Sequence, residues 1–285
     1  MKVTKAVITA AGPDQRNLPL QTLIDRDGNR KTVLQILVEE VLEAGVEEIA
    51  VVLHPDDVTA YREACTPFLS QISFITQNTP SGYGQAMLCA AEFVGNDFFL
   101  HLVGDHLYVS RSQMRCAKHL IAIAELNNCS VSAVQPTREA LIPHFGVIGA
   151  SRIHGSNELY KVEKVIEKPT PTVAEQQLFV SGLRAGHYLC FFGMHVLSPT
   201  IMKILAQLQT ENPTKKLDLS SSLNELTVKE HYLALEISDW RFDMGAKYGL
   251  LKAQLSLALA GKDRDRLMAE LLEFFVTKDI HSIGR

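Results

Sequence analysis

The sequence predicts an α/β fold in which a mainly parallel sheet is covered by helices on both faces. Three observations predict it. Short apolar runs alternate with helical stretches through the first half of the 285-residue chain. These runs are apolar throughout, which is typical of parallel strands that are buried on both faces. Several of them end at glycine or proline, the residues that most often stop a strand.

The first half contains five predicted strands and four predicted helices. The strands span residues 6–10, 49–53, 72–76, 98–103 and 130–134. Thr32 is placed to cap a helix whose apolar residues, from Leu34 to Leu42, recur with helical spacing, and Gly45 stands where this helix ends. The other helices are predicted over residues 56–65, 85–93 and 112–126. Ligands in such sheets bind at the carboxyl ends of the strands, so the loops after residues 10, 76 and 103 are the candidate binding loops.

The second half predicts a small antiparallel extension of the same sheet. Its strands are expected over residues 145–153, 161–166, 189–192 and 233–237, with a helix over 199–208 and a helical tail over 248–276 that is interrupted near Gly261. No change of composition marks a linker. We therefore predict one domain over residues 1–247 with halves at about 1–135 and 136–247, followed by a helical tail over 248–285.

Composition excludes several classes of function. The chain has 28 Lys and Arg against 32 Asp and Glu, a net charge of −4, which argues against binding nucleic acid or an anionic membrane. No apolar stretch reaches the roughly 18 residues that cross a bilayer. The 5 cysteines are odd in number and form no C-x-x-C pair, which argues against a disulfide framework or a zinc site. We expect a cytoplasmic protein.

Two glycine-bearing loops are candidate binding sites for a nucleotide. Gly12, after the first strand, lets backbone N–H groups approach a phosphate or a base, and Arg16 adds a planar cation for phosphates. Gln77 and Gly82 follow the third strand at the start of a helix, where free N–H donors attract anions. The alternatives are an ordinary turn with a solvated arginine, and a capping loop after a polar strand end.

Three carboxylates and one lysine are candidates for metal and phosphate chemistry. Asp105 follows an apolar strand, where a carboxylate suits Mg²⁺ together with phosphate oxygens, and Asp243 in a glycine-bounded turn is a second carboxylate for the same cation. Glu167 and Lys168 are adjacent on an extended segment and so point to opposite faces, but they reach a sugar hydroxyl and a phosphate respectively if the strand curls at Pro169. The alternatives are a helix-capping Asp105, a turn aspartate at 243 and a surface charge pair.

The order of these motifs resembles the sugar-1-phosphate nucleotidyltransferases, and within them most closely the bacterial UTP–glucose-1-phosphate uridylyltransferases. The motifs are Ala-Ala-Gly-x-x-x-Arg at residues 10–16, Gln77, Gly82-Tyr83-Gly84-Gln85-Ala86, Gly104-Asp105, Phe145-Gly146-Val147, Glu167-Lys168-Pro169 and Phe242-Asp243-Met244-Gly245. The resemblance runs from Lys5 to about Ala253. It implies a Rossmann-like, GT-A-like nucleotidyltransferase fold. It also implies a Mg²⁺-dependent reaction in which a sugar 1-phosphate attacks the α-phosphorus of a nucleoside triphosphate, giving pyrophosphate and a nucleotide sugar, expected to be a UDP-sugar.

The resemblance assigns the matching residues to two halves of a site. On the nucleotide side, in residues 1–135, it places the base against the backbone of Ala10, Ala11 and Gly12, with Gln77 and Gly82 beside the uracil and ribose. On the sugar-phosphate side, in residues 136–247, Gly146 and Glu167 match residues that hold the sugar hydroxyls, and Lys168 matches a lysine on the sugar phosphate. Asp105 matches the Mg²⁺ ligand, and Asp243 matches a second acidic position near the metal. We expect Arg16, Asp105 and Lys168 to be catalytic.

The first loop departs from the family pattern, which usually reads Gly-x-Gly-Thr-Arg followed by a Pro-Lys pair. Here Pro13 removes a backbone donor, and Asp14 places a negative charge near the expected triphosphate. No lysine stands at the expected place. Arg30 and Lys31 are the nearest cations, and they would need a different loop path to replace it.

Two other functions stay open from the sequence. One is a related protein that binds a nucleotide sugar or sugar phosphate with little or no turnover. The other is a glycosyltransferase, against which the single acid of Gly104-Asp105-His106 argues. The apolar spacing of Leu267, Leu271, Leu272 and Phe275 in the tail allows packing on the body or a contact between copies of the chain.

Overall fold

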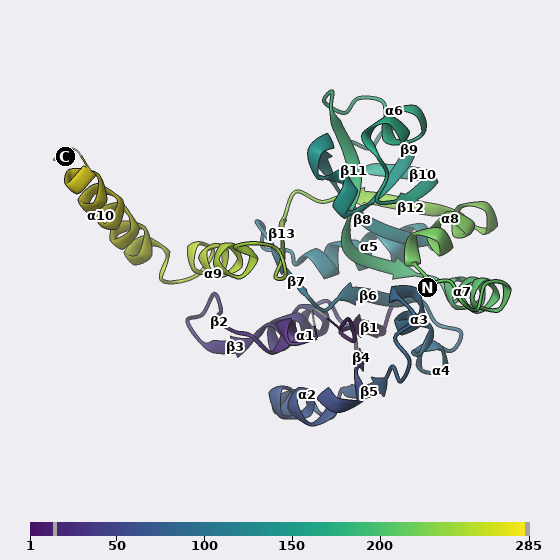
Figure 1. Cartoon of the computed structure of the whole chain (residues 1–285), viewed down its shortest axis with the longest axis horizontal. Helices are drawn as coiled ribbons and strands as arrows, with labels where there is room; N and C mark the ends of the chain where they lie inside the picture. The colour runs from purple at the N-terminus through teal and green to yellow at the C-terminus, as the bar shows by residue number, and fades with distance from the viewer. Residues whose placement is uncertain (14–15, 283–285) are drawn as a thin grey trace.

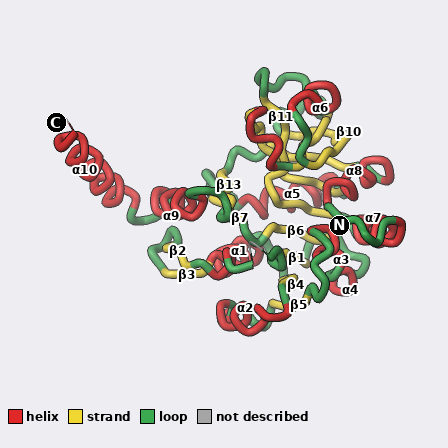
Figure 2. The backbone as a smooth tube through the Cα atoms, viewed as in Figure 1, coloured by secondary structure: helices red, strands yellow, loops and turns green. Residues whose placement is uncertain are grey.

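A computed structural model describes residues 1–13 and 16–282 and confirms the predicted α/β fold. Within these residues, nine strands form one sheet in the order β5–β4–β1–β6–β11–β8–β12–β10–β9, with helices on both faces (Figures 1 and 2). The strands are β1 (Lys5–Thr9), β4 (Glu48–Leu53), β5 (Ile72–Thr76), β6 (Phe99–Val103), β8 (Ser130–Arg138), β9 (Gly146–Arg152), β10 (Leu159–Glu167), β11 (His187–Leu197) and β12 (Tyr232–Glu236).

Two short strand pairs and the helices complete the described fold. The pairs are β2 (Thr22–Ile24) with β3 (Arg30–Thr32), and β7 (His106–Val109) with β13 (Trp240–Asp243). The helices are α1 (Val33–Glu43), α2 (Val58–Ala64), α3 (Tyr83–Leu88), α4 (Ala91–Val94), α5 (Cys116–Asn127), α6 (Pro171–Gln177), α7 (Thr200–Glu211), α8 (Leu219–Lys229), α9 (Gly249–Leu259) and α10 (Arg264–Ser282).

The parallel half of the sheet brings the candidate loops to one edge. β1 pairs in parallel with β4 and β6, and β4 pairs in parallel with β5. The carboxyl ends of β1, β5 and β6 are Thr9, Thr76 and Val103, so the loops that follow them meet at this edge. The ends of α1 also follow the prediction. Thr32 Oγ1 accepts a hydrogen bond from the Gln35 N–H at 3.2 Å, and Gly45 takes a φ of 97° directly after the helix.

The antiparallel extension in the second half is confirmed. β11 runs antiparallel to β6, β8 and β9, and β10 runs antiparallel to β9 and β12. Several strands are longer than predicted, β8 and β11 by the most. β8 continues to Arg138, and β11 continues through Gly193, where a positive φ of 84° and a shift in its register with β8 mark a bulge. β11 therefore joins the parallel strands to the antiparallel ones.

Some predicted helices differ in extent from the structure. The helix predicted over residues 85–93 is divided into α3 and α4, separated by Cys89 and Ala90. The helix predicted from residue 112 starts only at Cys116, because Ser112 forms a local turn in which its Oγ accepts from the Met114 N–H at 3.2 Å.

The tail is interrupted around Gly261, as predicted. α9 packs on the body, where the Gln254 side chain hydrogen-bonds both the N–H and the carbonyl of Ile24 at 2.8 and 3.1 Å. α10 extends away from the body (Figure 1) and leaves Leu272 58% and Phe275 59% exposed. A contact between copies of the chain stays a prediction. No helix in the described residues is long and apolar enough to cross a membrane.

Candidate functional site

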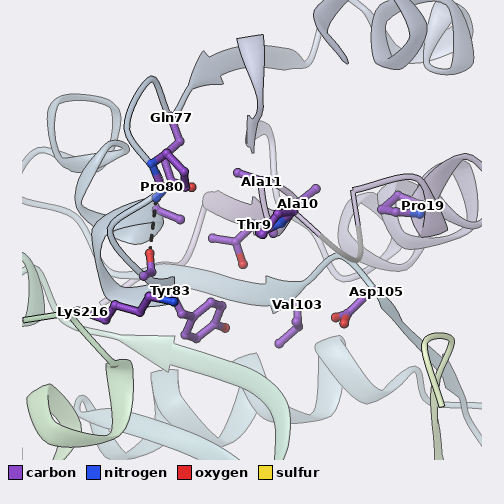
Figure 3. Close-up of a pocket in the computed structure, with 14 residues that line it drawn as sticks. Thr9, Ala10, Ala11, Pro19, Gln77, Pro80, Tyr83, Val103, Asp105 and Lys216 are labelled. Atoms are coloured by element: carbon purple, nitrogen blue, oxygen red, sulfur yellow. Dashed lines mark hydrogen bonds between the residues drawn. The ribbon is translucent and has the colours of Figure 1, made fainter. Parts of the chain in front are cut away.

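Two adjoining cavities open at the carboxyl edge of the parallel strands. The first encloses about 240 Å³ between the loops after β1, β5 and β6 (Figure 3). The second encloses about 320 Å³ and extends to β9, β10 and β13. Tyr83, Val103 and Asp105 line both, so the two cavities meet at Asp105. The predicted site residues in the first are Ala10, Ala11, Gly12, Gln77, Gly82 and Asp105, and those in the second are Asp105, Gly146, Glu167, Lys168 and Asp243.

The wall of the first cavity at the end of β1 is made of main chain. The Ala10 N–H donates to the Val52 carbonyl at 2.7 Å, and the Gly104 N–H donates to the Thr9 carbonyl at 2.9 Å. A Cβ on Gly104 would lie 2.8 Å from that carbonyl oxygen, so only glycine allows the β1 and β6 loops to approach this closely. The result is a rigid wall of small residues, which suits the flat face of a base.

Gln77 lies on the opposite side of the first cavity (Figure 3). It is 3% exposed, and its N–H donates to the Leu53 carbonyl at 2.9 Å. Its side-chain amide donates to the Gly82 carbonyl at 3.3 Å and to the Gln85 side chain. The amide is thereby held in one orientation, as a group that hydrogen-bonds a base edge must be.

Gly82 is fixed by a strand-like contact with the loop before α8. Its φ is 115°, and a Cβ there would lie 2.6 Å from the Leu217 carbonyl oxygen. The Gly84 N–H donates to that oxygen at 2.8 Å, and the Leu217 N–H donates to the Ser81 carbonyl at 3.0 Å. This contact also brings Lys216 into the lining of the first cavity (Figure 3), a position that sequence reasoning missed.

Asp105 and Asp243 are brought together by the β7–β13 pair. Asp243 lies opposite His106 in the register, and the Met244 N–H donates to the Asp105 carbonyl at 2.9 Å. Asp105 is 6% exposed. Its Oδ1 is buried without a hydrogen-bond partner in the described part of the chain, and it lies 3.6 Å from His106 Nδ1.

This carboxylate pair fits a divalent cation. Asp243 Oδ1 accepts from the N–H groups of Gly245 and Ala246 at 2.9 and 3.2 Å, which fixes its orientation, while the unpartnered Asp105 oxygen is free to coordinate. Within the described residues, no group of three or more His, Cys, Asp or Glu is arranged to hold a metal. Two carboxylates without further protein ligands are the donor set that Mg²⁺ uses when phosphates and waters complete its shell.

Cation binding at Asp105 should depend on pH. Burial, with a further contribution from the Asp243 charge, raises the pKa of Asp105 to about 6. Below that pH the carboxyl is protonated, so cation affinity should fall about tenfold for each further pH unit of acidification. Calorimetric Mg²⁺ titrations at several values between pH 5 and 8 measure this. An affinity that stays constant between pH 5 and 7 would show that Asp105 is not a ligand.

The far wall of the second cavity carries the predicted sugar-phosphate residues. Glu167 Oε2 accepts from the Ser220 hydroxyl at 2.6 Å, and a Cβ on Gly146 would lie 2.7 Å from the same hydroxyl oxygen. Lys168 has a left-handed φ of 48°, and its Nζ lies 3.8 Å from Glu167 Oε1. Because of that turn, Glu167 and Lys168 both line the second cavity, whereas adjacent residues of a regular strand point to opposite faces.

Two cations near the first loop, Arg16 and Lys31, form ion pairs with neighbouring carboxylates. Arg16 Nε lies 3.1 Å from Asp57 Oδ2, and Arg16 is absent from the described lining of both cavities. Lys31 Nζ lies 2.8 Å from an Asp25 oxygen and 2.7 Å from a Glu39 oxygen. Held by these two carboxylates, Lys31 does not replace the missing lysine. Pro13 does line the first cavity, whereas Asp14 lies outside the described residues.

Like Lys216, Arg241 and His106 were not chosen as site residues from the sequence. Arg241 lines the second cavity two residues before Asp243, and His106 lines it directly after Asp105. Burial lowers the pKa of His106 to about 3, so its imidazole is neutral at neutral pH. Arg241 and Asp243 share a face of β13 because residues two apart on a strand point the same way, but the sequence predicted a turn here and so gave no such signal.

Comparisons with known proteins agree with this arrangement. A family model described as "Nucleotidyl transferase" matches residues 16–259. The chain is also similar to UTP–glucose-1-phosphate uridylyltransferases over most of their length. The protein from Streptococcus pneumoniae is 30% identical over 90% of this chain and 91% of its own. The protein from Mycoplasma genitalium is 29% identical over 92% of this chain and 94% of its own length. The solved structure of a UTP-bound UGPase from Acinetobacter baumannii has a TM-score of 0.72 at 22% identity, over 95% of this chain and 98% of its own, which supports the fold.

Proposed function

The chain belongs to the nucleotidyl transferase family, and from this premise we propose that it makes a nucleotide sugar and pyrophosphate from a nucleoside triphosphate and a sugar 1-phosphate. The relatives favour UTP and glucose 1-phosphate as the substrates. The observation that carries the proposal is the meeting of two cavities at one buried carboxylate, Asp105. Such a junction suits a reaction that joins two phosphorylated molecules.

The first cavity suits the nucleotide. The main chain of Ala10, Ala11 and Gly12 offers a flat wall without bulky side chains, and the fixed amide of Gln77 offers a hydrogen-bonding edge to uracil. Gly82 also lines this cavity, beside the base and ribose, and its lack of a side chain lets the main chain pack closely on Leu217. The triphosphate then extends toward Asp105, where the second cavity begins.

The second cavity suits the sugar phosphate. Glu167 accepts hydrogen bonds from sugar hydroxyls, and Gly146 lines the cavity in which the sugar ring lies. The Lys168 ammonium is a charge partner for the sugar phosphate. The two halves of the site come from residues 1–135 and 136–247, which we propose form one domain because β11 pairs with strands of both.

The reaction needs placement and charge neutralisation more than covalent help. A sugar phosphate is already an anionic nucleophile, so no general base is needed, and Asp105 and Asp243 are free to act as ligands. They would hold Mg²⁺, which when bound neutralises charge on the phosphoryl oxygens. Attack in line with the departing pyrophosphate follows if both substrates lie in their cavities at once.

One observation favours a second function. Pro13 lines the first cavity, whereas Arg16 pairs with Asp57 and is absent from the described lining of both cavities. A protein that binds a nucleotide sugar with little turnover, as a sensor or regulatory partner, would tolerate this loss. An active enzyme needs cations from elsewhere in the site.

Pyrophosphate release tests the two functions against each other. UTP, dTTP, CTP, ATP and GTP are each mixed with several sugar 1-phosphates, with and without Mg²⁺. Turnover that requires Mg²⁺ and is fastest with UTP and glucose 1-phosphate is the expected result. Binding of UDP-glucose without release from any pair would support the second function and overturn the first.

A further inference from the structure

Arg241 is a cation of the second cavity that forms no ion pair with a carboxylate of the described residues. It lies on β13 between Asp243 and the exposed Trp240, and it is partly buried against two aromatic rings. The guanidinium carbon lies 4.4 Å from the centre of the Phe145 ring and 5.9 Å from that of Phe192. Stacking of this kind orients the guanidinium plane without neutralising its charge.

The hydrogen bonds of Arg241 leave most of its donors unused. Among the described residues, its one acceptor is the Phe191 carbonyl, which takes a hydrogen bond from Nη1. A guanidinium has five N–H donors. No carboxylate oxygen of the described residues lies within 4.0 Å, the limit of an ion pair, although Asp105 and Asp243 line the same cavity. A cation held in this way is poised for an anionic ligand.

The position of Arg241 identifies which anion it meets. It lines the second cavity with Gly146, Glu167 and Lys168, and it is absent from the described lining of the first. Among the described residues that line this cavity, Lys168 and Arg241 are the lysine and the arginine, so they carry its side-chain positive charges. A phosphate between them and the Asp105–Asp243 pair belongs to the molecule in the second cavity, the sugar 1-phosphate, rather than to the departing pyrophosphate.

We propose that Arg241 is a catalytic residue that binds the phosphate of the sugar 1-phosphate and orients its attacking oxygen. The inference rests on the proposed function. As that oxygen bonds to the α-phosphorus, the bond from the α-phosphorus to the bridging oxygen breaks, and its electron pair leaves with pyrophosphate. Arg241 keeps its protons throughout and donates to the non-bridging oxygens of the nucleophile. It thus supplies, from the sugar side, positive charge that the first loop does not provide.

Kinetics of Arg241→Gln and Arg241→Lys test the proposal. Arg241→Gln should lower kcat/KM for glucose 1-phosphate about 10²-fold, the usual effect of losing one charge-stabilising donor, and leave the KM for UTP within about twofold. Arg241→Lys should recover part of the loss, because it restores the charge without the planar fork. Arg152→Gln is the matched control, since Arg152 also stacks on an aromatic ring, 4.8 Å from the centre of Tyr160, but lines neither cavity in the described residues.

The kinetic results distinguish a role of Arg241 toward the sugar phosphate from a general effect of the substitution. A raised KM for glucose 1-phosphate with a KM for UTP that stays within about twofold supports the proposal, whereas equal rises of both KM values or unchanged kinetics overturn it. If Arg241→Gln fails to fold, Arg241→Lys decides by the same KM comparison. A wild-type protein without turnover contradicts the proposed function instead. Equilibrium binding of glucose 1-phosphate and of glucose to wild type and Arg241→Gln then tests Arg241 alone, and a loss confined to the phosphorylated sugar is the expected result.

Discussion

Replacing Asp105 with asparagine is expected to reduce pyrophosphate release on the order of 10³-fold, because it removes the buried ligand at the junction of the two cavities. The same change should leave the fold intact or stabilise it. Burial raises the pKa of Asp105, so its charged form is costly in the native state at neutral pH, and asparagine carries no charge. Steady-state kinetics and thermal unfolding of the same preparation measure both effects.

Asp97→Asn is the control for this variant. Asp97 is an exposed carboxylate whose partner is Lys5 at 2.8 Å, and its loss should change neither activity nor stability appreciably. An Asp105→Asn protein with more than a tenth of wild-type turnover would show that the cation, if one binds, is held elsewhere. A parallel loss of activity and stability would instead indicate a structural role for Asp105.

Replacing Gly82 with alanine is expected to destabilise the protein by about 3 kcal/mol and to abolish binding of UTP. The added Cβ would lie 2.6 Å from the Leu217 carbonyl oxygen and 3.0 Å from its nitrogen, and these are main-chain atoms that cannot rotate away. Relief of the clash would break the hydrogen bonds that join Ser81 and Gly84 to Leu217. The Gln77 side chain would then lose its fixed orientation, because the Gly82 carbonyl accepts a hydrogen bond from its amide.

Gly45→Ala separates backbone strain from the clash. Gly45 also has a positive φ, 97°, but an added Cβ there meets nothing within 4 Å. Its replacement should cost only the left-handed strain of about 1 to 2 kcal/mol and leave UTP binding unchanged. Urea unfolding and calorimetric titration with UTP compare the two variants. Equal free energies of unfolding would contradict the role given to the Leu217 contact.

The sequence predicted those parts of the site that depend on local pattern. Short apolar runs placed the loops after β1, β5 and β6 at one edge, because parallel strands share their direction. Thr32 and Gly45 marked the ends of α1 through the hydrogen-bonding and conformational preferences of those two residue types. These signals lie within a few residues of the features that they specify.

Features that depend on distant partners could not be predicted in this way. β7 and β13 are four residues each and pair across the middle of the chain, so neither is periodic enough to be recognised alone. The partners of Lys31 are close in the sequence, but no regular spacing shows that Asp25 and Glu39 both contact its ammonium. The left-handed turn at Lys168 is set by the Phe145 carbonyl, which accepts from its N–H at 2.9 Å.

The pairing of β11 has a consequence for how the chain is made. β11 is the neighbour of β6 on the side away from β1, yet it lies almost a hundred residues further along the chain. During synthesis, strands β1, β4, β5 and β6 emerge with the edge of β6 open, and an open edge of apolar strands invites pairing with other chains. The nascent protein is therefore most exposed to aggregation, and most in need of a chaperone, until residue 197 has left the ribosome.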